Sequence, residues 1–178
     1  MGDVQVVLVS GVPGAGKTTI ARKLAEHFPR SAHLEGDQIG EGFIINGLVR
    51  PDGTPTDEAN AQLLLRRKNI CLLADSYAAA GFTPVVDDVV VSQAVLDTYL
   101  TLLTTRPVGL VQLSPDLETL QQRDAERDKQ VLDRWRHLYA ELRRDMPRVG
   151  LWLDTSGLSA EETVAQVAHR LGEAVVAR

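Results

Sequence analysis

The segment Gly11-Val12-Pro13-Gly14-Ala15-Gly16-Lys17-Thr18 fits the pattern G-x-x-x-x-G-K-[ST] and decides the architecture of the chain. The aliphatic run Val4–Val9 precedes it directly and has the length and β-branching of a buried strand. The run Thr19–Ala25 follows it and has the pattern of a helix. A glycine-rich turn between a strand and a helix is the usual setting of a phosphate-binding loop, so the sequence predicts one here.

The chemistry expected of this loop follows from its residue types. Glycines allow the backbone to curl with its N–H groups pointing inward, in conformations that are costly for residues with a Cβ. The helix that begins at Lys17 adds its positive dipole end. We expect the Lys17 ammonium to reach the β- and γ-phosphates of ATP and the Thr18 hydroxyl to ligate Mg²⁺. The residues expected to bind the nucleotide are Gly11, Val12, Pro13, Gly14, Ala15, Gly16, Lys17, Thr18 and Thr19.

The rest of the chain has the pattern of a single α/β domain. Its 178 residues suit one domain, and its low aromatic share of 4% implies a core of aliphatic side chains. Such strands are typical of a parallel sheet covered on both faces. The expected strands are Val4–Val9, Ser31–Leu34, Pro84–Val86, Val108–Leu113 and Leu151–Leu153. Helical segments follow these strands, so we predict a three-layer fold with a five-stranded parallel sheet and helices on both faces.

The expected helices have recognisable ends. Two of them span Glu58–Ala80 and Ser92–Thr104. A third is predicted to be capped by Ser114, with Pro115 at its first position. The last begins at a capping box, Ser159 with Glu162, and its apolar face is expected to continue to Val175.

Composition and charge narrow the classes of partner. The net charge is −5, whereas proteins that bind along a nucleic-acid backbone usually carry a net positive charge. No apolar run approaches the ~18 residues of a membrane span, and the first residues do not resemble a signal peptide. The single cysteine, Cys71, cannot form an internal disulfide. We therefore expect a cytoplasmic protein with no nucleic-acid or membrane partner.

Two acidic clusters each follow an expected strand. In parallel sheets ligands bind at the carboxyl ends of the strands, so these carboxylates are expected near a ligand. Asp37, in Glu35-Gly36-Asp37, is a candidate general base for an attacking hydroxyl and a candidate substrate contact; the alternative is a solvated cap of the next turn. Asp87 ends an aliphatic strand, as a carboxylate that holds Mg²⁺ does. Asp88 is a candidate substrate contact, and helix capping is the alternative for this pair.

An arginine-rich segment, residues 123–148, is expected to form a helical lid. Most of its arginines alternate with acidic residues, which is typical of a solvated helix face. Arg123 and Arg127 lie four residues apart after the fourth strand, where an arginine can neutralise charge on a phosphoryl group during transfer. These two are candidate catalytic residues, and Arg134 is a third candidate.

Taken together, these elements resemble the chloramphenicol phosphotransferase-like small-molecule kinases of the P-loop NTPase superfamily. The matching segments are Gly11–Thr18, Gly36-Asp37, Gly81–Val89, Leu113–Arg127 and Leu151–Ser159. The resemblance implies ATP and Mg²⁺ as cofactors, phosphorylation of a hydroxyl on a small molecule such as an antibiotic, and Asp37 as the base. It also implies that the turn Thr155–Leu158 approaches the adenine.

Other functions share the same loop. A nucleoside or nucleotide kinase would combine it with a base-recognising pocket. An NTP-binding regulatory protein would hydrolyse slowly, but the fourth strand ends without the lysine of a guanine-specific motif. A nucleic-acid end-kinase is disfavoured by the acidic balance and by the lack of a basic stripe with aromatics.

Overall fold

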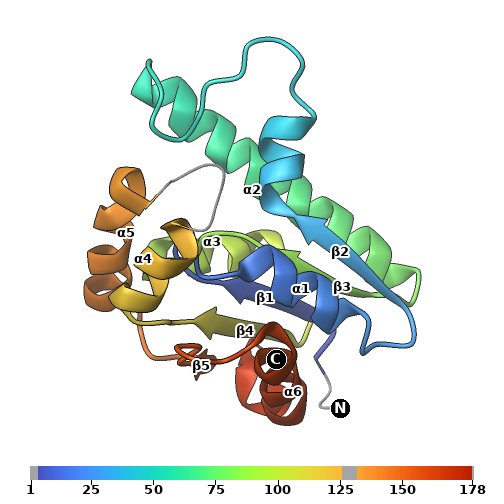
Figure 1. Cartoon of the computed structure of the whole chain (residues 1–178). Coiled ribbons are helices and arrows are strands. Elements are labelled where there is room, and N and C mark those ends of the chain that lie inside the picture. The colour runs from blue at the N-terminus through green and yellow to red at the C-terminus, as the bar shows by residue number, and fades with distance from the viewer. Residues whose placement is uncertain (1–3, 126–131, 178) are drawn as a thin grey trace.

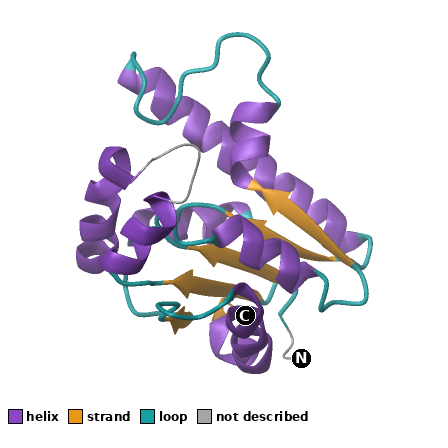
Figure 2. Ribbon diagram, viewed as in Figure 1, coloured by secondary structure: helices purple, strands orange, loops and turns teal. Residues whose placement is uncertain are grey.

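The computed structural model describes residues 4–125 and 132–177, with only the backbone for residues 132–134. Its centre is a parallel sheet in the order β2-β3-β1-β4-β5 (Figures 1 and 2). The strands are β1 (Val6–Ser10), β2 (Ser31–Glu35), β3 (Thr83–Asp87), β4 (Val108–Leu113) and β5 (Leu151–Leu153). The five-stranded parallel sheet is thus confirmed, and every residue of β1 and β4 is buried as its aliphatic sequence requires.

A sixth strand, β6 (Val175–Ala177), pairs antiparallel with the beginning of β4. The prediction of one helix continuing to Val175 was therefore wrong. Helix α6 (Ala160–Arg170) begins at the predicted Ser159 capping box but ends earlier, and the short turn η2 (Leu171–Ala174) leads into the strand. The reason is that β5 is short: it pairs with Val111–Leu113 and leaves the first residues of the same β4 edge for β6.

Helices cover both faces of the sheet (Figure 1). Helix α1 (Lys17–Ala25) and α6 lie on one face, and α2 (Thr56–Ala79) and α3 (Gln93–Leu102) lie on the other. No helix among the described residues combines the length and apolarity needed to cross a bilayer.

The segment after β4 differs in detail from its prediction. Helix α4 (Leu117–Ala125) begins later than the expected cap at Ser114. The backbone N–H of Ser114 donates to Leu153 O at 2.9 Å, which extends the sheet, while Asp116 Oδ1 accepts from the Thr119 N–H at 2.7 Å. Asp116 therefore caps the first turn of α4 by accepting from a free backbone N–H, the role that was predicted for Ser114.

Of the expected lid at 123–148, the described residues form the end of α4 and helix α5 (Leu132–Asp145). Leu142 is buried in the core, as is Met146 just beyond the helix. The carboxyl-terminal end of this segment is thus anchored to the domain, and Trp135 and Leu138 of α5 line the cavity described next.

Candidate active site

The glycine-rich loop follows β1, the central strand, and leads into α1. The strands that follow β1 in the chain lie on both of its sides, β3 on one and β4 on the other, and α/β sheets bind ligands where the strand order reverses in this way. Gly14 and Gly16 have φ angles of 92° and 90°, which strain residues with a Cβ. A Cβ on Gly11 would lie 2.8 Å from Ala15 Cβ and 2.9 Å from Leu113 O. The loop therefore has the tight backbone curl that a phosphate cradle needs.

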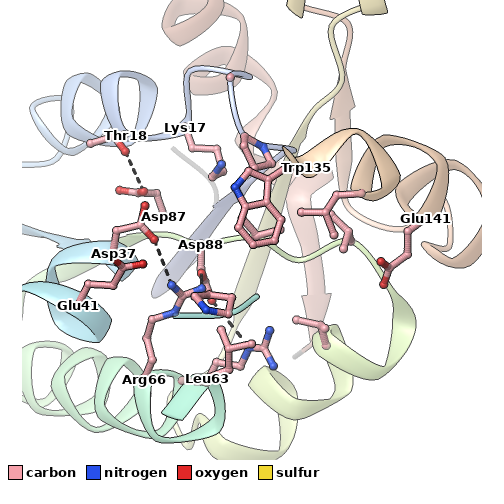
Figure 3. Close-up of a pocket in the computed structure, with 18 of the residues that line it drawn as sticks. Lys17, Thr18, Asp37, Glu41, Leu63, Arg66, Asp87, Asp88, Trp135 and Glu141 are labelled. Carbon is pink, nitrogen blue, oxygen red and sulfur yellow. Dashed lines mark hydrogen bonds and ion pairs between the residues drawn. The ribbon is translucent and has the colours of Figure 1, made fainter. Parts of the chain in front are cut away.

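The two predicted metal ligands lie together at the end of this loop (Figure 3). The Thr18 hydroxyl donates to Asp87 Oδ1 at 3.0 Å. Register explains the meeting, because Asp87 on β3 pairs with Val9 at the end of β1. The other oxygen, Asp87 Oδ2, lies 2.6 Å from His33 Nε2. His33 was not predicted, since its approach depends on the pairing of β2 with β3, for which the sequence has no signal.

Asp37 lies beside Asp87 in the site (Figure 3), just before the short π-helical turn η1 (Gln38–Gly42). Its side chain is 80% exposed, and its Oδ1 accepts from Arg66 Nη1 at 3.1 Å. Gly36 gives the backbone room here, because a Cβ on it would lie 2.8 Å from Asp87 O. The structure thus brings Asp37 to the strand edge that also carries Asp87, as predicted from the sequence.

Arg66, on α2, donates hydrogen bonds to both Asp37 and Asp88. The sequence did not predict this role. Arg66 Nη2 donates to Asp88 Oδ1 at 2.5 Å, and the Tyr99 hydroxyl donates to Asp88 Oδ2 at 2.5 Å. Burial alone would lower the pKa of Arg66, but the carboxylates of Asp88 and Asp37 outweigh burial and raise it. Burial and the nearby Asp88 raise the pKa of Tyr99 well above its ordinary value, so its hydroxyl remains a donor.

Asp88 is only 5% exposed, and its two oxygens accept from different elements of the fold. It therefore anchors Arg66, and a contact between Asp88 and a substrate stays a prediction. The Arg66 side chain packs against the backbone of Gly40. Only glycine fits there, because a Cβ at that position would collide with Arg66 Cδ.

Of the arginines predicted to assist transfer, the structure describes the side chain of Arg123 only. Arg123 donates to Thr155 O at 2.9 Å and also contacts Leu158 O and Ala15 O. It thus ties the phosphate loop to the 155–158 turn, and a role in phosphoryl transfer stays a prediction. Arg127 and the side chain of Arg134 lie outside the described residues.

A cavity of about 580 Å³ is lined by the phosphate loop together with Asp37, Arg66, Asp87 and Asp88. One end is bordered by the phosphate loop, including Lys17 and Thr18, and by Asp37 and Asp87. The other end lies between α2 and α5, whose Leu63, Trp135 and Glu141 line it (Figure 3). A space of this size fits a small ligand beside the phosphate-binding end.

Among the described residues, no cluster of three or more His, Cys, Asp or Glu side chains could hold a metal alone. A hydroxyl and a carboxylate 3.0 Å apart nevertheless suit Mg²⁺, which takes oxygen ligands and keeps several waters. The chemistry of Thr18 and Asp87 thus fits a magnesium ion that is shared with phosphate oxygens.

Comparisons with known proteins agree with this architecture. A family model described as "AAA domain" matches residues 6–149. A cytidylate kinase of Methanopyrus kandleri is 27% identical over 172 residues, which cover 89% of this chain and 88% of the relative.

Solved structures share the fold. A sugar kinase from Janibacter sp. superposes with a TM-score of 0.69 at 16% identity, covering 96% of both chains. The tunicamycin resistance protein of Deinococcus radiodurans superposes with a TM-score of 0.62 at 20% identity, covering 98% of this chain and 99% of that one. Because the family model spans most of its length, the chain belongs to the AAA domain family, with the fold of the P-loop kinases.

Proposed function

We propose that the protein transfers the γ-phosphoryl group of ATP, with Mg²⁺, to a hydroxyl of a small molecule. The observation that carries this proposal is the single cavity bordered by both the phosphate loop and Asp37. A phosphate cradle alone would suit any NTP-binding protein, whereas a carboxylate that lines the same cavity beside the cradle supports group transfer.

At the nucleotide end, the residues suited to ATP are those of the loop and of the start of α1. Backbone N–H groups and the helix dipole favour phosphate oxygens there, and Lys17 adds a cation. Thr18 and Asp87 would hold Mg²⁺, which would neutralise charge on the phosphates. His33 contacts the oxygen of Asp87 that faces away from Thr18, so it holds this carboxylate in position.

Beside the phosphate loop, where an acceptor hydroxyl would meet the γ-phosphate, Asp37 is the proposed general base. Arg66 contacts its Oδ1, which leaves Oδ2 to accept the proton of an acceptor hydroxyl. As the hydroxyl oxygen forms its bond to the γ-phosphorus, the bond from that phosphorus to the bridging oxygen breaks and ADP leaves. The proton passes to Asp37, so the products are a phosphate ester, ADP and the protonated carboxyl group. Arg66 has the position of a group that orients the base.

The acceptor could belong to either of two classes. An antibiotic or sugar hydroxyl agrees with the resemblance to chloramphenicol phosphotransferase-like kinases and with the presence of Asp37 as a base. A nucleotide kinase is the second candidate, supported by the similarity to a cytidylate kinase. A phosphate acceptor is already anionic and needs no base, so the position of Asp37 favours the hydroxyl.

The test is a screen of hydroxyl compounds and nucleoside monophosphates with ATP and Mg²⁺, in which phosphorylated products are identified by mass spectrometry. For the best acceptor, we expect Asp37→Asn to keep ATP affinity and to lower kcat by about 10²–10⁴-fold, the usual contribution of a general base. Near-normal turnover of Asp37→Asn would remove Asp37 from the mechanism. A product phosphorylated on an existing phosphate would favour the nucleotide-kinase alternative.

A further inference from the structure

Arg67 lines the acceptor end of the cavity, and its charge is poorly matched by its surroundings. Its side chain is 17% exposed, and its nearest carboxylate oxygen, Asp88 Oδ2, lies 3.9 Å from its Nε. That distance is too long for a hydrogen bond, and Nε has no hydrogen-bond partner within the part of the chain that the structure describes. A largely buried guanidinium with so little compensation is expected to bind an anion.

The neighbouring arginine shows the contrast. Arg66 donates to two carboxylates, and Asp88 already accepts from both Arg66 and Tyr99. Each oxygen of Asp88 thus already has a close donor, whereas the ion pair between Arg67 Nε and Asp88 Oδ2 is loose, at 3.9 Å. The two consecutive arginines of α2 thus differ in function: Arg66 holds the base in place, whereas Arg67 remains available to a ligand.

Most of the remaining acceptor wall is apolar. Its side chains come from α2, from the segment after β3, and from α3 and α5: Leu63, Val89, Val91, Val95, Trp135 and Leu138. Such a wall suits the hydrocarbon or aromatic body of a ligand, and the few polar side chains of the lining, Arg67 among them, set its orientation. The acidic side chains Glu41 and Glu141 also border the cavity, so a ligand with many negative charges would be repelled.

We propose, resting on the proposed function, that Arg67 binds an oxyanion of the acceptor. The acceptor is then an apolar hydroxyl compound that also carries a carboxylate or a phosphate ester. One weakly paired guanidinium among several carboxylates matches a single negative charge better than two, so a carboxylate is the better fit.

The experiment compares matched acceptors that differ only in this charge. Mandelate is paired with mandelamide, 4-(hydroxymethyl)benzoate with its amide, and cytidine 5′-monophosphate with cytidine. Each is tested with the wild-type protein, with Arg67→Gln, and with Lys68→Gln as the control. Lys68 is the next residue of the same helix, but it is exposed and lies outside the cavity lining.

We expect Arg67→Gln to raise KM for the anionic member of a pair about 10- to 100-fold, the effect of losing one charge-assisted hydrogen bond. The KM for ATP and the KM for neutral acceptors should change less than about threefold. Lys68→Gln should change none of these values. Arg67→Lys, which keeps the charge, should recover part of the affinity and guards against a folding defect in Arg67→Gln. A larger effect on phosphate-bearing than on carboxylate-bearing acceptors would identify the phosphate ester as the source of the oxyanion.

A binding measurement separates this proposal from the proposed function. Benzoate and phenyl phosphate are titrated calorimetrically into each variant in the presence of ADP and Mg²⁺. Arg67-dependent binding without phosphorylation of any acceptor would support the anion site and refute the proposed kinase activity. Efficient phosphorylation of neutral acceptors, with no effect of Arg67→Gln, would refute the anion site and leave the kinase activity. Failure of both probes to bind the wild type would also overturn the anion site.

Discussion

Replacing Arg66 with Met should lower the free energy of unfolding by about 3–5 kcal/mol, because one partner of a buried ion pair is removed while the other remains. Asp88 is 5% exposed and would keep only the Tyr99 hydroxyl as a close donor. Arg67 Nε, 3.9 Å away, is too distant to replace the lost hydrogen bond. Asp37 is the other partner of Arg66, but its side chain is 80% exposed and water would solvate it.

This difference in burial predicts very different effects for the two ends of the network. Asp37→Asn should cost less than about 1 kcal/mol, the usual size of an exposed ion pair. Arg66→Met, in contrast, should remove a large part of a total stability that is typically about 5–15 kcal/mol. For a protein of this size each kcal/mol corresponds to about 2–4 °C, so the Tm of Arg66→Met should fall by about 6–20 °C.

The assay is equilibrium unfolding in urea, followed by tryptophan fluorescence and by circular dichroism. The variants are Arg66→Met, Asp37→Asn, Asp88→Asn and the double variant Arg66→Met/Asp88→Asn. The double variant should be more stable than Arg66→Met, because the uncompensated charge is gone. A loss below about 1 kcal/mol in Arg66→Met, or an equal loss in Asp37→Asn, would refute the reasoning that burial of Asp88 sets the magnitude.

The remaining predictions concern the nucleotide and the pH. Lys17→Ala should abolish or severely weaken ATP binding in calorimetry, because the phosphates lose their cationic partner; unchanged affinity would contradict the cradle. Burial acts to raise the pKa of Asp75, but hydrogen bonds from Thr104 and Thr105 outweigh it and lower the pKa. Its stabilising effect should thus be present above about pH 4, the ordinary Asp value, and be lost as the pH falls through the lower folded pKa. Urea unfolding of Asp75→Asn should show a loss of about 1 kcal/mol at pH 7, after allowance for solvent screening, that disappears once the pH has fallen below the lowered folded pKa of Asp75; a pH-independent difference would contradict this assignment.

Local patterns were sufficient wherever the physical cause is local. The glycines, lysine and threonine of residues 11–18 predicted the loop because the left-handed backbone angles of Gly14 and Gly16 are a local property of glycine. The runs before Asp37 and Asp87 predicted strand ends, and in a parallel sheet those ends meet at one edge. The Ser159 capping box was likewise predicted, since both of its hydrogen bonds lie within four residues.

Only the tertiary structure could decide the parts that depend on which elements pack together. Arg66-Arg67-Lys68 reads as an ordinary charged helix surface, and the packing of α2 beneath η1 is what buries Arg66, partly buries Arg67 and leaves Lys68 exposed. His33 meets Asp87 through the pairing of two strands that are far apart in the sequence. The end of the chain becomes a strand because short β5 leaves part of the β4 edge unpaired. The sequence alone therefore determined the phosphate loop and the layered sheet, whereas the surroundings of Asp37, the proposed base, and of the proposed anion site came from long-range packing, which has no local pattern.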